Sequence, residues 1–469
     1  MEIDYDNDTW KVIDTFFNYD RYYLTKHHLD SYDDFIRNKI PQTFKQYNPQ
    51  ILYKEFDKEI NGYKYEKHIY YGGKDSDKIY IGNPVIVSNN SVKKMYPNEA
   101  RLRNLTYASH IYCDIYIEYF IGKDRTKVTK NFEKVCIGKI PIMLHSKMCI
   151  LNGRSFDVLK NMGECPYDQG GYFIIDGQEK VIVSHERKAE NKLYIVKAQE
   201  DMFSYSAQIK SIPDNSFKYA RTTVVNIHEK TGIITVRLPS IKTHIPLFVL
   251  FRALGIESDK EILSFILYEL KSEKAELFME FLRASIEDVG PIYSQHLALK
   301  YLAPLTMGNS ISHLLDIINT DVFPHMGDNR ISKAYYLGYV VNKLLCVQFG
   351  IDTPTDRDSF VYKRVDLSGF LLASLFRENF KQFQRDSKIE IDSKYRFNSG
   401  QYQDLDYANI INEDNIKEIF NQNVIEKSMM KAFKIGTILN KKGLIQSLNR
   451  LSNVGAISHL RRINTYGDN

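Results

Sequence analysis

The stretch GGYFIIDGQEKVIVSHE, residues 170–186, carries the clearest structural signal in the chain. Two apolar runs, Tyr172–Ile175 and Val181–Val183, lie on either side of the pair Asp176-Gly177. Asp-Gly is a preferred pair for the two-residue type I′ turn, in which both residues have positive φ. The stretch therefore predicts a β-hairpin that turns at Asp176 and Gly177.

Sheet-like and helix-like segments surround this hairpin. Polar and apolar side chains alternate, as they do in strands, in residues 64–139 and 200–240. Apolar side chains recur at the three- and four-residue spacing of helices in residues 10–44, 245–350 and 366–436. The opening helices are expected to end near Pro41. A chain of 469 residues is long enough for two to four domains, so we predict an α+β multidomain protein.

Composition excludes several classes of protein. Hydrophobic residues make up 43% of the chain and charged residues 26%, which is typical of a globular protein and not of a disordered one. The longest apolar run, Ile245–Phe251, is too short to cross a bilayer, and the acidic start MEIDYDNDTW is unlike a secretory signal. The five cysteines form no C-x-x-C pair, so we expect buried, reduced thiols and no disulfide framework or zinc site.

Motifs for catalysis are missing from the sequence. It contains no G-x-x-x-x-G-K-[ST] phosphate loop and no G-x-G-x-x-G, and His185-Glu186 is followed by Ala189 where a zinc protease needs a second His. Nucleotidyl transfer requires carboxylates that converge on two magnesium ions, and no compact cluster of that kind occurs. Asp352, Asp356 and Asp358 fit caps and turn acceptors better than metal ligands. We predict no catalytic residue and no metal ligand.

Positive charge is concentrated at the C-terminal end. Eight basic residues and a single acidic residue lie between Lys427 and Asn469, a net charge of +7 in a chain whose total is +5. Such a concentration is typical of a site for a polyanion. A solvated tail is the alternative, but a tail would lack the apolar residues that recur here at helical spacing, with Asn449 and Arg450 on the opposite side: Leu444, Leu448, Leu451, Val454, Ile457 and Leu460. We therefore predict a structured, helix-bearing segment that binds nucleic acid.

Four motifs, in order, resemble those of the second-largest subunits of multisubunit DNA-directed RNA polymerases. They are PNEARLRNLTY (Pro97–Tyr107), the stretch from CPYD through GGYFII to ER (Cys165–Arg187), TDRD with KR and DL (Thr355–Leu367), and QSLNR with SHLRRINT (Gln446–Thr465). The segment FPHMG at Phe323–Gly327 is most similar to versions from large DNA viruses.

The resemblance implies an architecture. Residues 1–190 would form the first segment of a mixed helix and sheet protrusion, 191–368 an inserted α+β lobe, 369–430 the second segment of the protrusion, and 431–469 the beginning of a fork region. This corresponds to the N-terminal portion of a family member. A split gene, a piece of an intein-interrupted gene and a cloned fragment all remain open, and we favour a split or interrupted gene.

The resemblance also implies function. The active-site carboxylates of the family, with their magnesium, lie on the largest subunit, so we expect no cofactor on this chain. The chain would form one side of the DNA cleft and part of the RNA–DNA hybrid site, through residues that match the family's hybrid-lining positions: Gln446, Asn449, Arg450, His459, Arg461 and Arg462. Guanidinium groups suit phosphate oxygens, and amides can reach sugars or base edges. Alternatively, Arg450 or Arg462 pairs with a buried carboxylate of the missing half of the subunit, and Glu99, Arg101 and Arg103 are expected in an ion-pair network inside the protrusion.

The resemblance also implies binding partners. They are the largest subunit, the remaining C-terminal part of the second-largest subunit, other polymerase subunits, the DNA template and the nascent RNA, with no membrane. The expected location is intracellular, in a nucleus or a cytoplasmic viral factory, or packaged in a virion. The alternative function is a non-catalytic nucleic-acid-binding, assembly or regulatory protein that reuses the protrusion and lobe.

Overall fold

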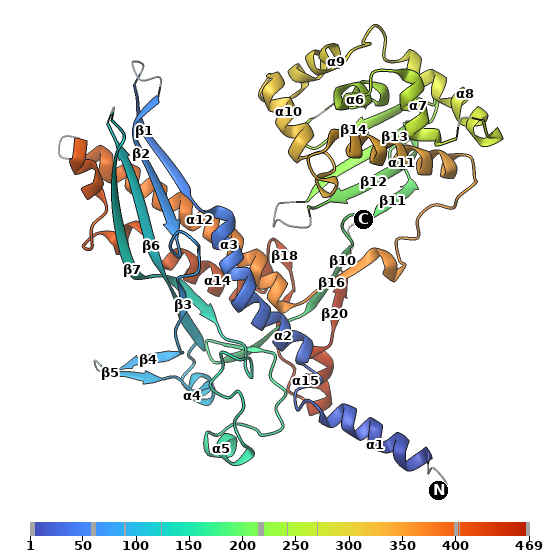
Figure 1. Cartoon of the computed structure of the whole chain (residues 1–469). Helices are drawn as coiled ribbons and strands as arrows, with labels where there is room; N and C mark the ends of the chain where they lie inside the picture. Colours follow the sequence, from blue (N-terminus) through green and yellow to red (C-terminus); the bar gives the residue numbers. More distant parts are fainter. Residues whose placement is uncertain are drawn as a thin grey trace. The chain divides into compact units, whose positions relative to one another are not determined.

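The computed structural model describes residues 5–57, 62–88, 91–122, 124–213, 220–241, 243–269, 271–397, 402 and 404–465. The chain forms two compact units (Figure 1): unit 1 comprises Met1–Arg187 with Val365–Asn469, and unit 2 is Lys188–Arg364. Both units combine helices with sheets, which confirms the α+β multidomain class. The identification of their parts as protrusion, lobe and fork stays a prediction.

The main sheet of unit 1 is antiparallel and consists of long strands. Its order is β1-β2-β6-β3, and β6 also pairs with β7. The bounds are β1 Gln50–Asp57, β2 Gly62–Tyr71, β3 Ile79–Ile81, β6 Ala108–Ile121 and β7 Thr126–Pro141. These strands account for the alternating pattern between residues 64 and 139. Within that range the chain also forms a small hairpin, β4 Val85–Ser88 and β5 Ser91–Lys94, and the short helix α4, Pro97–Leu102.

Helices open unit 1, as predicted, but they do not end near Pro41. They are α1 Tyr5–Asn18, α2 Lys26–Asp34, the π-helical turn η1 Phe35–Lys39 and α3 Ile40–Tyr47. Pro41 lies in the first turn of α3. A π-helical turn lies directly before α3, and the helical chain continues through Pro41 even though this residue has no N–H to donate.

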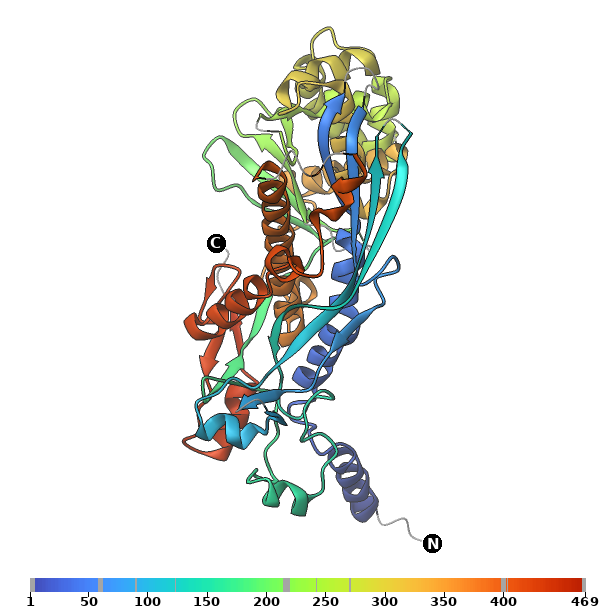
Figure 2. The same ribbon diagram turned by 90° about the vertical axis from the view of Figure 1, so that its left-hand side faces the viewer.

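The long helix α12 (Ser368–Phe397) and helix α14 (Asn423–Ile435) complete the large core of unit 1. Figure 2 shows them running along the strands. Phe376 and Phe380 of α12 and Phe433 of α14 belong to one buried cluster with the isoleucines of β6. Short elements connect the two helices, η5 Asp404–Ile410 and α13 Ile416–Ile419.

A second, smaller core holds the predicted hairpin. Strands β8 (Phe173–Ile175) and β9 (Gln178–Ile182) pair antiparallel, and φ is 47° at Asp176 and 78° at Gly177. Both values are positive, which confirms the predicted turn. Leu448, Ala456 and Leu460 pack on the apolar side chains of this hairpin.

The C-terminal segment is only partly helical. The helical spacing of its apolar residues is wrong as a prediction for residues 444–451, because β19 (Ile445–Ser447) pairs with β9 and helix α15 spans only Asn453–Leu460. Leu451 is 94% exposed and Val454 77% exposed. The remaining short elements of unit 1 are α5 Phe156–Asn161, β10 Ser184–Lys188, β17 Thr437–Ile438, β18 Lys441–Lys442 and β20 Ile463–Thr465.

Unit 2 packs helices on an antiparallel sheet of order β11-β12-β13-β14-β15. The strands are β11 Leu193–Lys197, β12 Phe203–Ser211, β13 Arg221–His228, β14 Ile234–Arg237 and β15 Ile245–Pro246. The predicted turn at Lys230-Thr231-Gly232 lies between β13 and β14. The helices are α6 Leu247–Leu254, α7 Asp259–Leu267, α8 Glu273–Glu287, α9 Gln295–Leu302, α10 Ile311–Thr320 and α11 Arg330–Gln348, with 3₁₀ turns at Ala303–Leu305, Pro324–Met326 and Phe360–Tyr362. The short strand β16, Lys363–Asp366, follows.

Candidate nucleic-acid interface

The predicted site residues lie on a folded segment and not on a solvated tail. Gln446 stands opposite Val181 in the antiparallel pairing of β19 with β9. Ser452 caps α15, because its hydroxyl accepts a hydrogen bond from the N–H of Gly455 at 3.0 Å. After α15, β20 pairs in parallel with β10. The segment is therefore held by β9 of the hairpin at one end and by β10, the strand that follows the hairpin, at the other.

Three of the predicted residues form one hydrogen-bonded cluster. The Nδ1 atom of His459 accepts the backbone N–H of Asn449 at 3.2 Å, so the ring proton lies on Nε2 and is donated to Oε1 of Gln446 at 3.0 Å. Burial, with the positive charge of Arg462, lowers the pKa of His459 and keeps the ring neutral. The amide nitrogen of Gln446 donates to the carbonyl of Gly443 at 2.9 Å.

Arg461 and Arg462 follow the last turn of α15, where cations are favoured. Both are exposed. Arg461 donates one hydrogen bond, from Nη1 to the carbonyl of Leu24 at 3.1 Å, which ties it to the segment before α2. For the Arg462 side chain, the described residues contain no hydrogen-bond or ion-pair partner. Its guanidinium is thus available to a phosphate.

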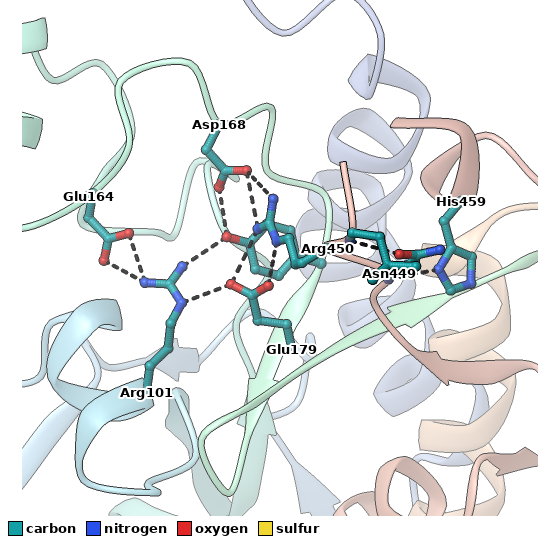
Figure 3. Close-up of polar contacts among 9 residues, drawn as sticks. Arg101, Glu164, Asp168, Glu179, Asn449, Arg450 and His459 are labelled. Atoms are coloured by element: carbon teal, nitrogen blue, oxygen red, sulfur yellow. Dashed lines mark hydrogen bonds and ion pairs between the residues drawn. The ribbon is translucent and has the colours of Figure 1, made fainter. Parts of the chain in front are cut away.

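Arg450 points away from this cluster, toward three carboxylates (Figure 3). We call Glu164, Asp168 and Glu179 the carboxylate cluster. The Nε atom of Arg450 donates to Glu179 at 2.6 Å, Nη2 donates to the other oxygen of Glu179 at 3.2 Å, and both Nη atoms lie 3.4 Å from Oδ1 of Asp168. The guanidinium carbon lies 4.9 Å from the centre of the Tyr172 ring, within the range of a cation–π contact.

Arg101, on α4, reaches the same cluster from the other side. It donates from Nε to Glu179 at 2.9 Å and from Nη1 to both oxygens of Glu164 at 3.0 and 2.8 Å. Its Nη2 atom donates to the hydroxyl of Tyr172, which in turn donates to Asp168. Burial alone would raise the pKa of Glu179, but the hydrogen bond and charge of Arg450, with Arg101, bring that pKa below its usual value. At Glu164 the effect of burial is larger than that of the charge of Arg101, and the pKa of this carboxyl is raised.

The structure thus places the six predicted residues in three settings. It brings Gln446, Asn449 and His459 together. It directs Arg450 to carboxylates of the same chain and not of a missing half, and it leaves Arg461 and Arg462 exposed after α15. The expected ion pairs of Arg101, and of Arg103 with Glu99, are confirmed. The role of the six predicted residues in nucleic-acid binding stays a prediction. Sequence reasoning missed the carboxylate cluster, because Glu179 and Asp168 are 271 and 282 positions from Arg450 and no local pattern links them.

Metal-ligand geometry is missing from the described part of the chain, which contains no group of three or more His, Cys, Asp or Glu that could hold an ion. Asp356 acts as a turn acceptor, since its Oδ1 atom accepts the N–H of Asp358 at 2.9 Å, and Asp352 pairs with Lys343. The five cysteines are free thiols, and Cys113, Cys149 and Cys346 are buried as expected, whereas Cys136 is half-buried and Cys165 is exposed. Among the described residues, no helix has the length and apolar character needed to span a membrane.

Comparisons with known proteins agree with the motifs. The family model described as RNA polymerase beta subunit matches residues 23–418. DNA-directed RNA polymerase II subunit RPB2 of Encephalitozoon cuniculi is 35% identical over 97% of this chain and 39% of its own length. DNA-directed RNA polymerase II subunit 2 of Arabidopsis thaliana is 33% identical over 98% of this chain and 39% of its own length.

An archaeal relative is matched over most of its length. DNA-directed RNA polymerase subunit Rpo2N of Methanothermobacter thermautotrophicus is 30% identical over 97% of this chain and 85% of its own length. The chain therefore spans about two fifths of the length of the eukaryotic relatives that it matches and most of this archaeal one.

Proposed function

This chain belongs to the RNA polymerase beta subunit family, and we propose that it acts as the N-terminal portion of the second-largest subunit of a DNA-directed RNA polymerase. It forms one side of the DNA cleft and part of the site for the RNA–DNA hybrid. The enzyme is a nucleotidyltransferase, and this chain contributes to it only within the assembled complex.

One structural observation supports the hybrid site most directly. The excess of positive charge after Lys427 belongs to a folded segment, and the exposed Arg461 and Arg462 lie together at its end. Guanidinium groups bind phosphate oxygens without regard to base sequence. Gln446 and Asn449 lie nearby on the same segment and add neutral amide groups.

The chemistry itself is proposed to come from partners. The described residues of this chain do not fit a magnesium site, so we assign magnesium and the catalytic carboxylates to the largest subunit. The other partners are the remaining C-terminal part of the second-largest subunit, further polymerase subunits, template DNA and nascent RNA. Such an enzyme acts where DNA is transcribed, in a nucleus or a cytoplasmic viral factory. A non-catalytic assembly or regulatory protein is less favoured, because the similarity to polymerase subunits covers 97–98% of the chain.

Transcription assays test the proposal. The purified chain, incubated with template, nucleotides and magnesium, is expected to make no RNA. The complex recovered from its native source through a tag on this chain is expected to make template-dependent RNA. RNA synthesis by the chain alone would contradict the assignment of catalysis to another subunit. A recovered complex without polymerase subunits would contradict the proposed function itself.

A further inference from the structure

Arg450 and its neighbour Asn449 project to opposite sides of one loop, as Figure 3 shows. The backbone N–H of Asn449 faces His459, whereas the guanidinium of Arg450 lies between Asp168, Glu179 and the ring of Tyr172. Although 42% of the Arg450 side chain is exposed, Nε and both Nη atoms donate to carboxylate oxygens.

This setting disfavours a phosphate contact by Arg450. The three carboxylates and the two guanidinium groups of Arg101 and Arg450 carry a net charge of −1. They line a surface pocket of about 660 Å³. A phosphate entering that pocket would have to break the bonds to Glu179 and approach like charges, which costs free energy at short range.

Glu179 forms hydrogen bonds with the segment 446–450 at two points. Its side chain binds Arg450, and its backbone carbonyl accepts the N–H of Leu448 at 2.9 Å. Arg101 fixes the same carboxylate from α4. The segment 446–450 is therefore attached to the β8–β9 hairpin by backbone and side chain together, and a two-point pair with a carboxylate that is only 16% exposed restricts motion more than a pair between two exposed groups does.

We propose that Arg450 is a positioning residue, which holds Gln446 and Asn449 in place through Glu179 and Asp168 and does not itself contact nucleic acid. This inference rests on the proposed function of the segment as a nucleic-acid site. It assigns to Arg450 a role different from that of Arg462, although both are exposed arginines of one basic segment.

Binding of the full chain to a fluorescently labelled RNA–DNA hybrid separates the two roles. Arg450→Gln is expected to weaken binding by roughly tenfold, the usual scale for loss of a charged hydrogen bond, with an unchanged dependence on salt. Arg462→Gln is expected to lower the magnitude of the salt slope by about one unit, as loss of one phosphate contact does. A fall of about one unit for Arg450→Gln would overturn the proposal.

Glu179→Gln provides the sharper test. Removing a negative charge near a polyanion site should tighten binding if only long-range charge matters. The positioning role predicts the reverse: weaker binding, and no further loss when Arg450→Gln is added. Glu99→Gln is the matched control, because Glu99 pairs with Arg103 outside the carboxylate cluster, and it should leave binding unchanged. Tighter binding by Glu179→Gln would overturn the proposal.

Hydrogen exchange in the free chain gives a readout that does not depend on nucleic acid. Arg450→Gln should speed exchange of the amides in residues 445–451, including those of Leu448 and Asn449, and leave the strands β6 and β7 unchanged. Unchanged exchange at 445–451 would contradict the positioning role. If neither the wild-type chain nor the complex recovered with it binds a hybrid while the exchange responds as expected, the proposed hybrid site fails and the attachment of the segment by Arg450 stands.

Discussion

His28 joins three segments that are far apart in the sequence. Its Nε2 atom lies 2.7 Å from the carbonyl oxygen of Leu460 at the end of α15, and its Nδ1 atom lies 3.2 Å from the hydroxyl of Ser368 at the start of α12. A carbonyl only accepts, so Nε2 carries a proton and donates it to Leu460. Burial is the largest cause that lowers the pKa of His28, to about 4. A neutral His28 thus fixes the turn that precedes Arg461.

The pKa of His28 predicts how stability depends on pH. Because it falls from 6.5 in the unfolded chain to about 4 in the folded one, stabilisation is fully present above pH 6.5 and is lost as the pH falls toward 4. Between pH 7 and pH 5 this one residue should remove about 2 kcal/mol from the free energy of unfolding. Urea unfolding of unit 1 should show a smaller loss in His28→Asn than in the wild type.

A second buried histidine limits the expected effect of the His28 substitution. His145 also has a pKa lowered to about 4, so His28→Asn should reduce the pH dependence and not abolish it. An equal loss of stability between pH 7 and pH 5 in the variant and the wild type would show that His28 is not the neutral group described here.

Arg461 and Arg462 differ by one hydrogen bond, and this difference is testable. Arg461 donates to the carbonyl of Leu24, so Arg461→Ala should destabilise the end of α15 and also weaken binding to a hybrid. Arg462→Ala should lower the salt slope by about one unit without changing the unfolding transition. Binding at several salt concentrations, with thermal unfolding of each variant, measures both. A loss of stability in Arg462→Ala would indicate a structural role.

At the level of elements, local signals were predictable and long-range ones were not. The turn at Asp176 and Gly177 could be predicted because two adjacent residues determine it. The helix over residues 444–460 could not be rejected from the sequence, because Leu444, Leu448 and Leu460 are all buried, although they lie in a bend, a loop and a helix in turn. Apolar residues can therefore recur every three or four positions without lying on one face of a single helix. The carboxylates around Arg450 likewise come from segments that only the fold brings together.

Lys333 shows how a buried cation can join two helices of unit 2. It lies on α11 and is fully buried, and its Nζ atom donates to the carbonyls of Ile318 and Asn319 at 2.8 and 2.6 Å. These carbonyls belong to the last turn of α10, where backbone acceptors lack partners within the helix and cations are favoured.

Lys333→Met should therefore destabilise unit 2. The variant keeps the length of the side chain but leaves two buried carbonyls without this donor, which should lower the free energy of unfolding by about 2–4 kcal/mol. Lys300→Met on α9 is the control, because Lys300 is exposed and its loss should change stability by less than about 0.5 kcal/mol. Thermal unfolding of both variants gives the comparison, and equal effects would contradict the role of Lys333.

On the scale of the whole molecule, two units with separate cores form one chain. Ile115, Phe376 and Phe433 belong to the core of unit 1, and Phe248 and Leu337 to that of unit 2. Unit 2, Lys188–Arg364, is inserted in the sequence between the two parts of unit 1. The alternation of sheet and helix patterns in the sequence predicted several domains. It could not predict which distant segments share a core, because such pairing depends on shape and not on local pattern.

Separate cores predict that packing defects stay within one unit. At Gly369, α12 crosses α2 so closely that a Cβ atom would overlap the backbone carbonyl oxygen of Ser31. Gly369→Ala should therefore destabilise unit 1 by about 3 kcal/mol or more, at or above the upper end of the range for overpacking. Gly82→Ala is the control, because its added methyl group would meet no atom closer than 3.7 Å. Residue-resolved hydrogen exchange in urea should show faster opening of α2 and α12 in Gly369→Ala with α10 and α11 unchanged, and the reverse in Lys333→Met. Opening of both units together in either variant would mean that they unfold as one cooperative body.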